Sequence, residues 1–174
     1  LLALRAKGYQ PRVVVTDLRC DYRSVIALVF PRAQYHQCLF HAEQEIGCHL
    51  RRTLGRNYAQ EHPAAEEMRA EIVKIFQVRT KRTARKRYQA LLARRDEYVE
   101  REPELQWLFA FLEEHWPFLV NAVESQLIPV TNNAVEMVIR RFDQHYQNFC
   151  GYESIETAHL HLGVFEKVYR LTPF

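Results

Sequence analysis

The feature that most constrains the fold is a run of β-branched residues that ends in a carboxylate. Arg12 is followed by Val13, Val14, Val15 and Thr16, and then by Asp17. Because no polar residue alternates within the run, it predicts a strand buried on both faces, typical of the centre of an α/β sheet. Ligand sites in such sheets gather at the carboxyl ends of strands, so Asp17 is a candidate functional residue. Alternatively, Asp17 caps the turn or the helix that follows, or Asp21 caps that helix.

A strand–helix–strand unit is predicted around this run. Residues 1–7 are typical of a helix end that Gly8 terminates. After Asp17, the apolar residues Val25, Ile26, Val29 and Phe30 recur at helical spacing until Pro31. Residues 34–39 form the second predicted strand.

The remainder of the chain has helical patterns. From 41 to 126 three apolar stripes recur with helical spacing, and a last pair of helices is expected at 134–149 and 154–170, with Gly151 between them. The stripes consist of Met68, Ile72, Ile75 and Phe76, then Tyr88, Leu91, Leu92 and Tyr98, then Trp107, Leu108, Phe111 and Leu112. The expected chain is therefore mostly helical by residue count.

Charge is concentrated in one segment. The 174 residues have a net charge of only +3, from 24 basic and 21 acidic residues. Eight of the basic residues lie between positions 79 and 95, where no acidic residue occurs: Arg79, Lys81, Arg82, Arg85, Lys86, Arg87, Arg94 and Arg95. No i,i+4 ion pair can form within such a run, which favours a polyanionic partner such as nucleic acid. The alternative is an ordinary solvated helix face.

Composition limits the class of protein. The chain is 48% hydrophobic and 26% charged, which indicates one globular domain rather than a disordered chain. Its apolar runs are too short for a membrane span, and residues 1–10 show no signal-peptide pattern. Four scattered cysteines do not suggest a disulfide framework. These observations predict a protein that is not secreted and has no membrane partner.

Glu136 is a second candidate carboxylate. It closes the segment Thr131-Asn132-Asn133-Ala134-Val135-Glu136, which opens a predicted helix. With Asn133 as N-cap, Glu136 fits the capping box, a purely structural role. The competing interpretation places Glu136 at the margin of the apolar face, about 100° round the helix from Val135, where it could face a metal.

Cys38 and His41 form a C-x-x-H pattern after the second predicted strand. Cys48 and His49 are close in sequence, so a zinc site is one interpretation, although this spacing is not a usual zinc pattern. A buried cysteine and a hydrogen-bonded histidine are the favoured alternative. The sequence shows no glycine-rich phosphate loop and no pattern typical of a Ser-His-Asp triad.

These segments together resemble a DDE transposase with an RNase H-like fold, of the Mutator-like group and its relatives among bacterial insertion sequences. The similarity rests on the order and spacing of four segments, namely 13–17, 30–41, 131–136 and 151–154 continuing to Thr172-Pro173-Phe174. It implies an α/β fold with a partial RNase H-like sheet and a long helical insertion. The implied parts are 1–42 and 127–174 for the RNase H-like core and 43–126 for the insertion.

The resemblance also implies roles for residues. Asp17 would be the second catalytic Asp and Glu136 the catalytic Glu, both ligands of Mg²⁺ or Mn²⁺. Cys38 and His41 would line the site, and Arg140 is a further candidate for DNA contact beside the basic run. The implied partners are transposon-end and target DNA, with a homo-oligomer in the full-length protein. The implied location is the bacterial cytoplasm near the nucleoid, or the nucleus of a eukaryote.

The family's first catalytic Asp has no counterpart here, so a truncated catalytic domain is expected. Two-metal cleavage and strand transfer need several carboxylates to hold the ions. We therefore expect this chain alone to be inactive, or nearly so. The alternative is a non-catalytic remnant that binds DNA or protein. A plain RNase H-like nuclease is disfavoured by the long insertion.

Overall fold

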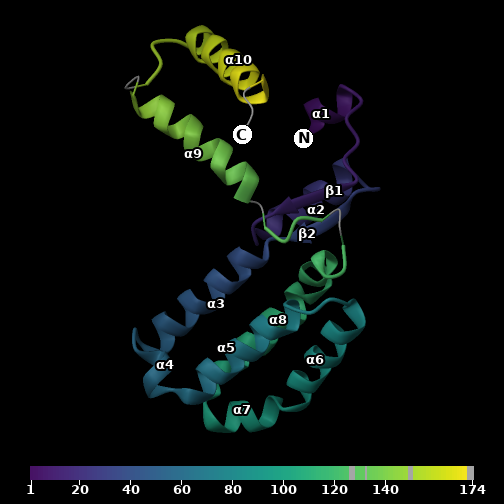
Figure 1. Ribbon diagram of the computed structural model, residues 1–174, viewed down its shortest axis with the longest axis vertical. Helices are drawn as coiled ribbons and strands as arrows, with labels where there is room; N and C mark the ends of the chain where they lie inside the picture. Colours follow the sequence, from purple (N-terminus) through teal and green to yellow (C-terminus); the bar gives the residue numbers. More distant parts are fainter. Residues whose placement is uncertain (126–127, 132, 149–150, 172–174) are drawn as a thin grey trace. The chain divides into compact units, whose positions relative to one another are not determined.

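The computed structural model describes residues 1–125, 128–131, 133–148 and 151–171, except for the side chains at 133–135, 145 and 169–171. The chain is mostly helical, with 72% helix and a two-stranded parallel sheet (Figure 1). It divides into two compact units, Leu1–Asn132 and Asn133–Phe174. The three-part division expected from the sequence stays a prediction.

The strand–helix–strand unit is present. Strand β1 (Val13–Thr16) pairs in parallel with β2 (Gln34–Gln37), and α2 (Cys20–Val29) connects them. Before them lies the short α1 (Leu2–Ala6), followed by Gly8 with a φ of 81°. The second strand ends two residues earlier than expected, because Cys38 donates its N–H to Thr16 O and already caps the next helix.

Three local expectations about this unit are wrong. Strand β1 is half-buried along its whole length instead of buried on both faces, because β2 is its only neighbouring strand in the part described. Val25 is 42% exposed, since α2 turns Ile26 and Val29 toward the core. The N-cap of α2 is Arg19, not either aspartate.

Helices α3 to α8 form the rest of the first unit, and most of the apolar stripe residues enter one core. Their bounds are α3 (Leu39–Leu54), α4 (Tyr58–Glu61), α5 (Pro63–Phe76), α6 (Lys81–Ala93), α7 (Arg95–Arg101) and α8 (Gln106–Leu119), with 3₁₀ turns η1 (Pro103–Leu105) and η2 (Val120–Ala122). The most deeply buried large side chains include Met68, Ile72, Leu91, Tyr98, Leu108 and Leu112. The second stripe is divided between α6 and α7, which meet at Arg94.

The end of α8 attaches this helical layer to the strands. In Figure 1, α3 leads away from β2 and α8 leads back toward it. The Nδ1–H of His36 donates to Phe118 O at 2.7 Å, since a carbonyl can only accept. Asn121 Nδ2 donates to Tyr35 O at 2.8 Å and so covers part of the open edge of β2.

The second unit is a pair of helices, as expected from the sequence. Helix α9 (Asn133–Asn148) and α10 (Ile155–Leu171) are separated by a turn in which Gly151 has a φ of 103°. The rings of Phe142 and Phe165 pack edge to face with centroids 5.4 Å apart. The side chain of Asn133, and with it the expected capping box, lies outside the described residues, as do Asn132, Cys150 and 172–174.

None of the helices in the described ranges has both the length and the hydrophobicity that crossing a membrane requires.

Candidate functional site

Asp17 lines a pocket in the first unit. The residue follows β1 directly, and the pocket has a volume of about 610 Å³. One wall comes from α3, with His41, Gln44, Glu45 and Cys48, and the other from α8, with Trp107, Ala110, Phe111, Glu114 and His115. The carboxyl end of a parallel strand is where ligand sites are expected in such sheets. The structure therefore brings Asp17 and His41 to one pocket.

The Asp17 carboxylate is held by one oxygen only. Its Oδ1 accepts the backbone N–H of Arg19 at 3.1 Å, a short turn of the kind aspartate favours. Oδ2 makes no hydrogen bond with any residue that the structure describes, and the side chain is half-buried. Asp17 thus has the structural role that the sequence allowed and retains a carboxylate oxygen, the ligand type that Mg²⁺ prefers.

Stacked rings form the α8 wall of the pocket. The Trp107 ring stacks on His49 with centroids 3.7 Å apart, and on Phe111 at 5.0 Å. Phe111 in turn contacts the His115 ring at 4.4 Å. Burial lowers the pKa of His49, and the nearby Arg52 lowers it further. Burial also lowers the pKa of His115, against the opposite effect of Glu114. Both shifts favour the neutral form of the ring.

Cys38 and His41 have different surroundings. His41 lines the pocket from the first turn of α3 and is half-buried. Cys38 is fully buried at the N-cap of α3, with a free thiol. Cys48 is exposed, also lines the pocket, and lies 3.3 Å from Arg51 Nη2. Within the described ranges, no three or more His, Cys, Asp or Glu side chains are grouped so that they could hold a metal ion.

Glu136 and Arg140 belong to the second unit. Glu136 lies in the first turn of α9, where a carboxylate is favoured by the helix dipole, and it is half-buried. Arg140 lies one turn later and is exposed. The two expected metal ligands therefore come from different units of the chain.

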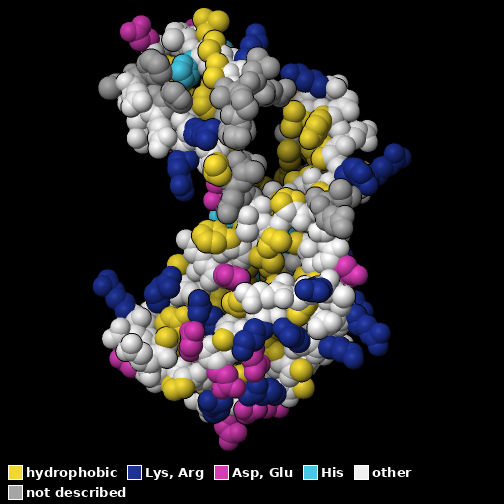
Figure 2. All heavy atoms as spheres, viewed as in Figure 1, with side chains coloured by type: hydrophobic (Ala, Val, Ile, Leu, Met, Phe, Trp, Pro, Cys, Tyr) yellow, Lys and Arg dark blue, Asp and Glu magenta, His cyan; other side chains and the backbone are white. Residues whose placement is uncertain are grey.

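The basic run separates into two groups, of which the first is an exposed face of α6. Lys81, Arg82, Arg85 and Lys86 recur at i, i+1, i+4 and i+5, and with Gln89 they line a shallow depression of about 310 Å³. All four side chains are exposed and make no ion pair within the part of the chain described. Figure 2 shows dark-blue side chains protruding where Figure 1 places α6. Arg79 is exposed just before the helix begins.

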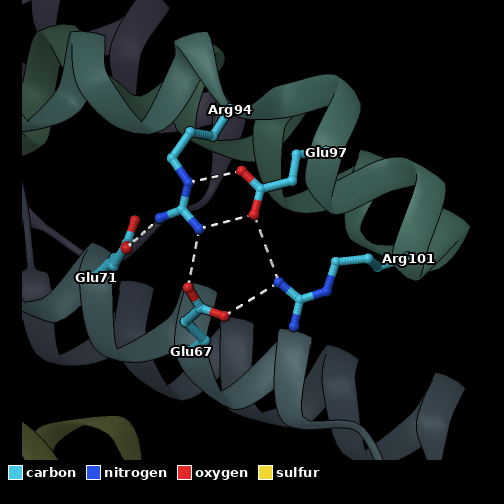
Figure 3. Close-up of polar contacts among 5 residues, drawn as sticks. All are labelled: Glu67, Glu71, Arg94, Glu97 and Arg101. Atoms are coloured by element: carbon cyan, nitrogen blue, oxygen red, sulfur yellow. Dashed lines mark hydrogen bonds and ion pairs between the residues drawn. The ribbon is translucent and has the colours of Figure 1, made fainter.

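The second group, Arg87, Arg94 and Arg95, is bound within the protein. Arg94 contacts Glu67, Glu71 and Glu97 at 2.9, 2.6 and 2.9 Å, and Arg101 joins the same cluster through Glu67 (Figure 3). Arg95 pairs with Glu113 at 3.1 Å, and Arg87 donates to Lys74 O at 2.6 Å. These contacts favour a structural role for the three side chains.

Contacts within the Arg94 cluster change the pKa values of its members. Hydrogen bonds from Arg94 hold the pKa of Glu97 and of Glu67 below the usual range of a glutamate. The same contacts raise the pKa of Arg94. The sequence run showed no acidic partner because Glu67 and Glu71 come from α5, and Glu97 lies just beyond the run.

The sequence did not identify several pocket residues as candidates for a functional site. Glu45, Glu114, His115 and Trp107 all line the pocket, and they lie in the segment interpreted only as an insertion. One signal was available, since His41, Glu45 and Cys48 lie at i, i+4 and i+7 and so share a helix face. Nothing local showed that α3 and α8 would face each other.

The first unit thus contains a pocket beside the carboxylate that ends β1 and, separately, an exposed cationic face on α6. The sequence profile of the Transposase IS66 family matches residues 33–160. The match covers most of the chain, so the chain belongs to the Transposase IS66 family. It includes Cys38, His41, Glu136 and the whole basic run, whereas Asp17 lies before it.

The match confirms the prediction of a transposase. The closer assignment to the Mutator-like group and the RNase H-like fold stay predictions. No curated protein and no solved structure matches the chain.

Proposed function

We propose that the chain forms part of the catalytic domain of a transposase that cleaves DNA and transfers its strands. In this proposal, β1, α2 and β2 belong to an RNase H-like sheet and α3 to α8 are the helical insertion. The observation that carries the proposal is the position of Asp17 at the carboxyl end of β1, on a pocket, with no hydrogen bond to Oδ2 from the described residues.

Asp17 and Glu136 are the proposed ligands of Mg²⁺ or Mn²⁺. Two such ions would activate the attacking water or DNA 3′-hydroxyl and stabilise the leaving oxygen in an in-line displacement at phosphorus. Asp17 is suited to this role because the Arg19 N–H fixes the carboxylate through Oδ1. Two carboxylates hold metal less firmly than three, so this chain alone is expected to show little or no cleavage.

DNA is the proposed partner of the α6 face. Like charges at i, i+4, namely Lys81 with Arg85 and Arg82 with Lys86, each destabilise the helix by a few tenths of a kcal/mol. Lys81 and Arg82 also stand in the first turn, at the positive end of the helix dipole. Phosphates relieve both effects. The proposed contact surface is therefore Arg79, Lys81, Arg82, Arg85 and Lys86, without Arg87, Arg94 and Arg95.

Metal binding tests the catalytic proposal. Mn²⁺ would be titrated into the chain and followed by the loss of its free-ion electron paramagnetic resonance signal. Asp17→Asn and Glu136→Gln should each weaken Mn²⁺ binding at least about tenfold, in line with the loss of a ligand. Asp21→Asn is the matched control, because Asp21 is an exposed aspartate four residues away. Equal binding by the wild type and Asp17→Asn would refute the proposal.

Plasmid cleavage gives a second measurement. Supercoiled DNA incubated with the chain and Mn²⁺ should remain largely uncut. Clear nicking that disappears in Asp17→Ala would contradict the expected inactivity of the chain alone, while supporting a catalytic role for Asp17.

The second candidate function is DNA binding without catalysis, and the exposed α6 face favours it. A binding module would hold DNA with a steep salt dependence, and its affinity would not change with Mg²⁺ or with Asp17→Asn. Mn²⁺ binding that requires both carboxylates would exclude this alternative.

A further inference from the structure

A series of hydrogen bonds connects helix α8 to the backbone carbonyl of Asp17. His115 Nδ1 lies 2.7 Å from Gln37 Oε1, and Gln37 Nε2 lies 3.5 Å from Tyr35 Oη. Tyr35 Oη lies 3.0 Å from Thr16 Oγ1, which donates to Asp17 O at 2.7 Å. This series of hydrogen bonds begins at His115 and ends at Asp17, and both residues line the pocket.

The parallel register explains why these side chains meet. Thr16 pairs with Gln37 and Val14 with Tyr35. Side chains two residues apart in a strand point to the same face, so Tyr35 and Gln37 share a face of the sheet with Thr16. His115 reaches this face from α8.

The four hydrogen bonds all run in one direction, with each donor nearer to His115 and each acceptor nearer to Asp17. Thr16 uses its hydroxyl proton on Asp17 O and must therefore accept from the Tyr35 hydroxyl. Tyr35 then accepts from the Gln37 amide, whose oxygen remains to accept from His115. This order fixes the proton of the neutral imidazole on Nδ1 of His115. Gln37 is buried, so the oxygen and nitrogen of its side-chain amide have little access to water as a substitute partner.

We propose that His115 is a positioning residue for Asp17, acting through Gln37, Tyr35 and Thr16. The series of hydrogen bonds holds the backbone carbonyl of Asp17, while the Arg19 N–H holds its carboxylate. The inference rests on the metal-binding role proposed for Asp17. His115 itself acts through other residues and needs no contact with the metal.

Two spectroscopic measurements test the chain of hydrogen bonds directly. In the unmodified protein, ¹⁵N resonances should show neutral His115 as the Nδ1–H tautomer. Tyr35→Phe removes the central hydroxyl and retains the ring that packs on Phe118. It should shift the ¹³C resonance of the Asp17 carbonyl. Tyr88→Phe is the matched control, because Tyr88 stacks on Trp116 and its hydroxyl bonds to no other residue in the described ranges. An Nε2–H tautomer, or an unmoved Asp17 resonance, would overturn the proposal.

Mn²⁺ affinity tests the consequence for Asp17. Tyr35→Phe should raise the Kd about tenfold, as expected when a residue that orients a ligand is altered, and Tyr88→Phe should change it less than about twofold. If binding requires Asp17 but Tyr35→Phe binds equally well, the positioning role is overturned and the proposed function stands. If the unmodified chain has no Asp17-dependent Mn²⁺ binding, the proposed function fails, and the resonances alone decide whether the chain of hydrogen bonds orders Asp17.

Discussion

The backbone N–H of Arg19 donates to Oδ1 of Asp17, with the nitrogen 3.1 Å from the oxygen, so this turn orients the carboxylate, and Oδ2 has no hydrogen bond from the residues that the structure describes. A turn-capping aspartate and a metal ligand are often treated as competing interpretations. Here one oxygen has the first role and the other is available for the second. The geometry of Asp17 therefore makes metal binding a question that solution measurements can answer.

Bound metal should stabilise the first unit through Asp17. At a Mn²⁺ concentration of 100 times the Kd, binding adds about 2.7 kcal/mol to the free energy of unfolding. For a chain of this length that corresponds to a rise in Tm of about 5–10 °C. Differential scanning fluorimetry should show the rise in the wild type and in Asp21→Asn, but not in Asp17→Asn. A similar rise in all three proteins would place the bound metal elsewhere.

The exposed face of α6 should determine DNA affinity. Changing Lys81, Arg82, Arg85 and Lys86 together to Gln should make the plot of log affinity against log salt concentration less steep by about 3.6, if each residue contacts one phosphate. Fluorescence anisotropy on a DNA duplex measures this slope. The matched control changes Lys7, Arg12, Arg32 and Arg56 to Gln, which removes the same charge from other exposed positions. An equal decrease of this slope in both variants would show that net charge, not the α6 face, drives DNA binding.

Arg94 should support the fold rather than bind DNA. Arg94→Gln removes the hydrogen-bonded centre of a cluster that joins α5 to α7, so Tm should fall by a few degrees. DNA affinity should change less than about twofold. Arg85→Gln should instead lower DNA affinity and leave Tm nearly unchanged, because Arg85 is exposed and without an ion pair among the described residues. A loss of DNA affinity in Arg94→Gln at unchanged Tm would reverse this assignment.

The Arg94 cluster should also make stability depend on pH. The pKa values of Glu67 and Glu97 are lower in the folded protein than their usual value of 4.5. Their contribution is therefore fully present above about pH 5, and it is lost as the pH falls through the folded pKa values. Urea unfolding between pH 3 and 7 should show that the difference between the wild type and Arg94→Gln shrinks in acid. A constant difference across this range would contradict the role of the cluster.

Helix α8 should be central to the core. Leu108 is fully buried, and Leu108→Ala should lower the free energy of unfolding by about 3 kcal/mol through lost burial and a cavity. Leu28 is 75% exposed on α2, so Leu28→Ala, the same chemical change, should cost less than about 0.5 kcal/mol. Equal effects in chemical denaturation would mean that α8 packs differently from this description.

Much of the local structure was predictable from spacing and turn residues. The β-branched run, Pro31 and the helical periodicities predicted β1, α2, β2 and the last two helices, α9 and α10, to within a few residues. Between 41 and 126 they predicted helical structure without its bounds. Gly8 and Gly151 were expected at turns, and both have a positive φ that other residues rarely adopt. Asp17 was identified from its place after a strand. These features depend on neighbours in sequence.

The pocket and the division of the basic run were not predictable in this way. Whether an arginine is free for DNA depends on what faces it, and Arg94 is distinguished from Arg85 only by glutamates on α5 and α7. His115 likewise acquires its relation to Asp17 from Gln37 and Tyr35, which lie about eighty residues before it in the sequence.

The sequence by itself therefore determined the strands, the helical character of the remainder, the candidate carboxylates and the resemblance to a transposase, because periodicity, turn chemistry and residue order are properties of neighbouring positions. Only the tertiary structure decided that β1 is half-buried, that α3 and α8 face each other across a pocket, and which basic side chains stay exposed. Those outcomes depend on contacts between residues far apart in the chain, and a long-range contact leaves no mark on the local pattern of either partner.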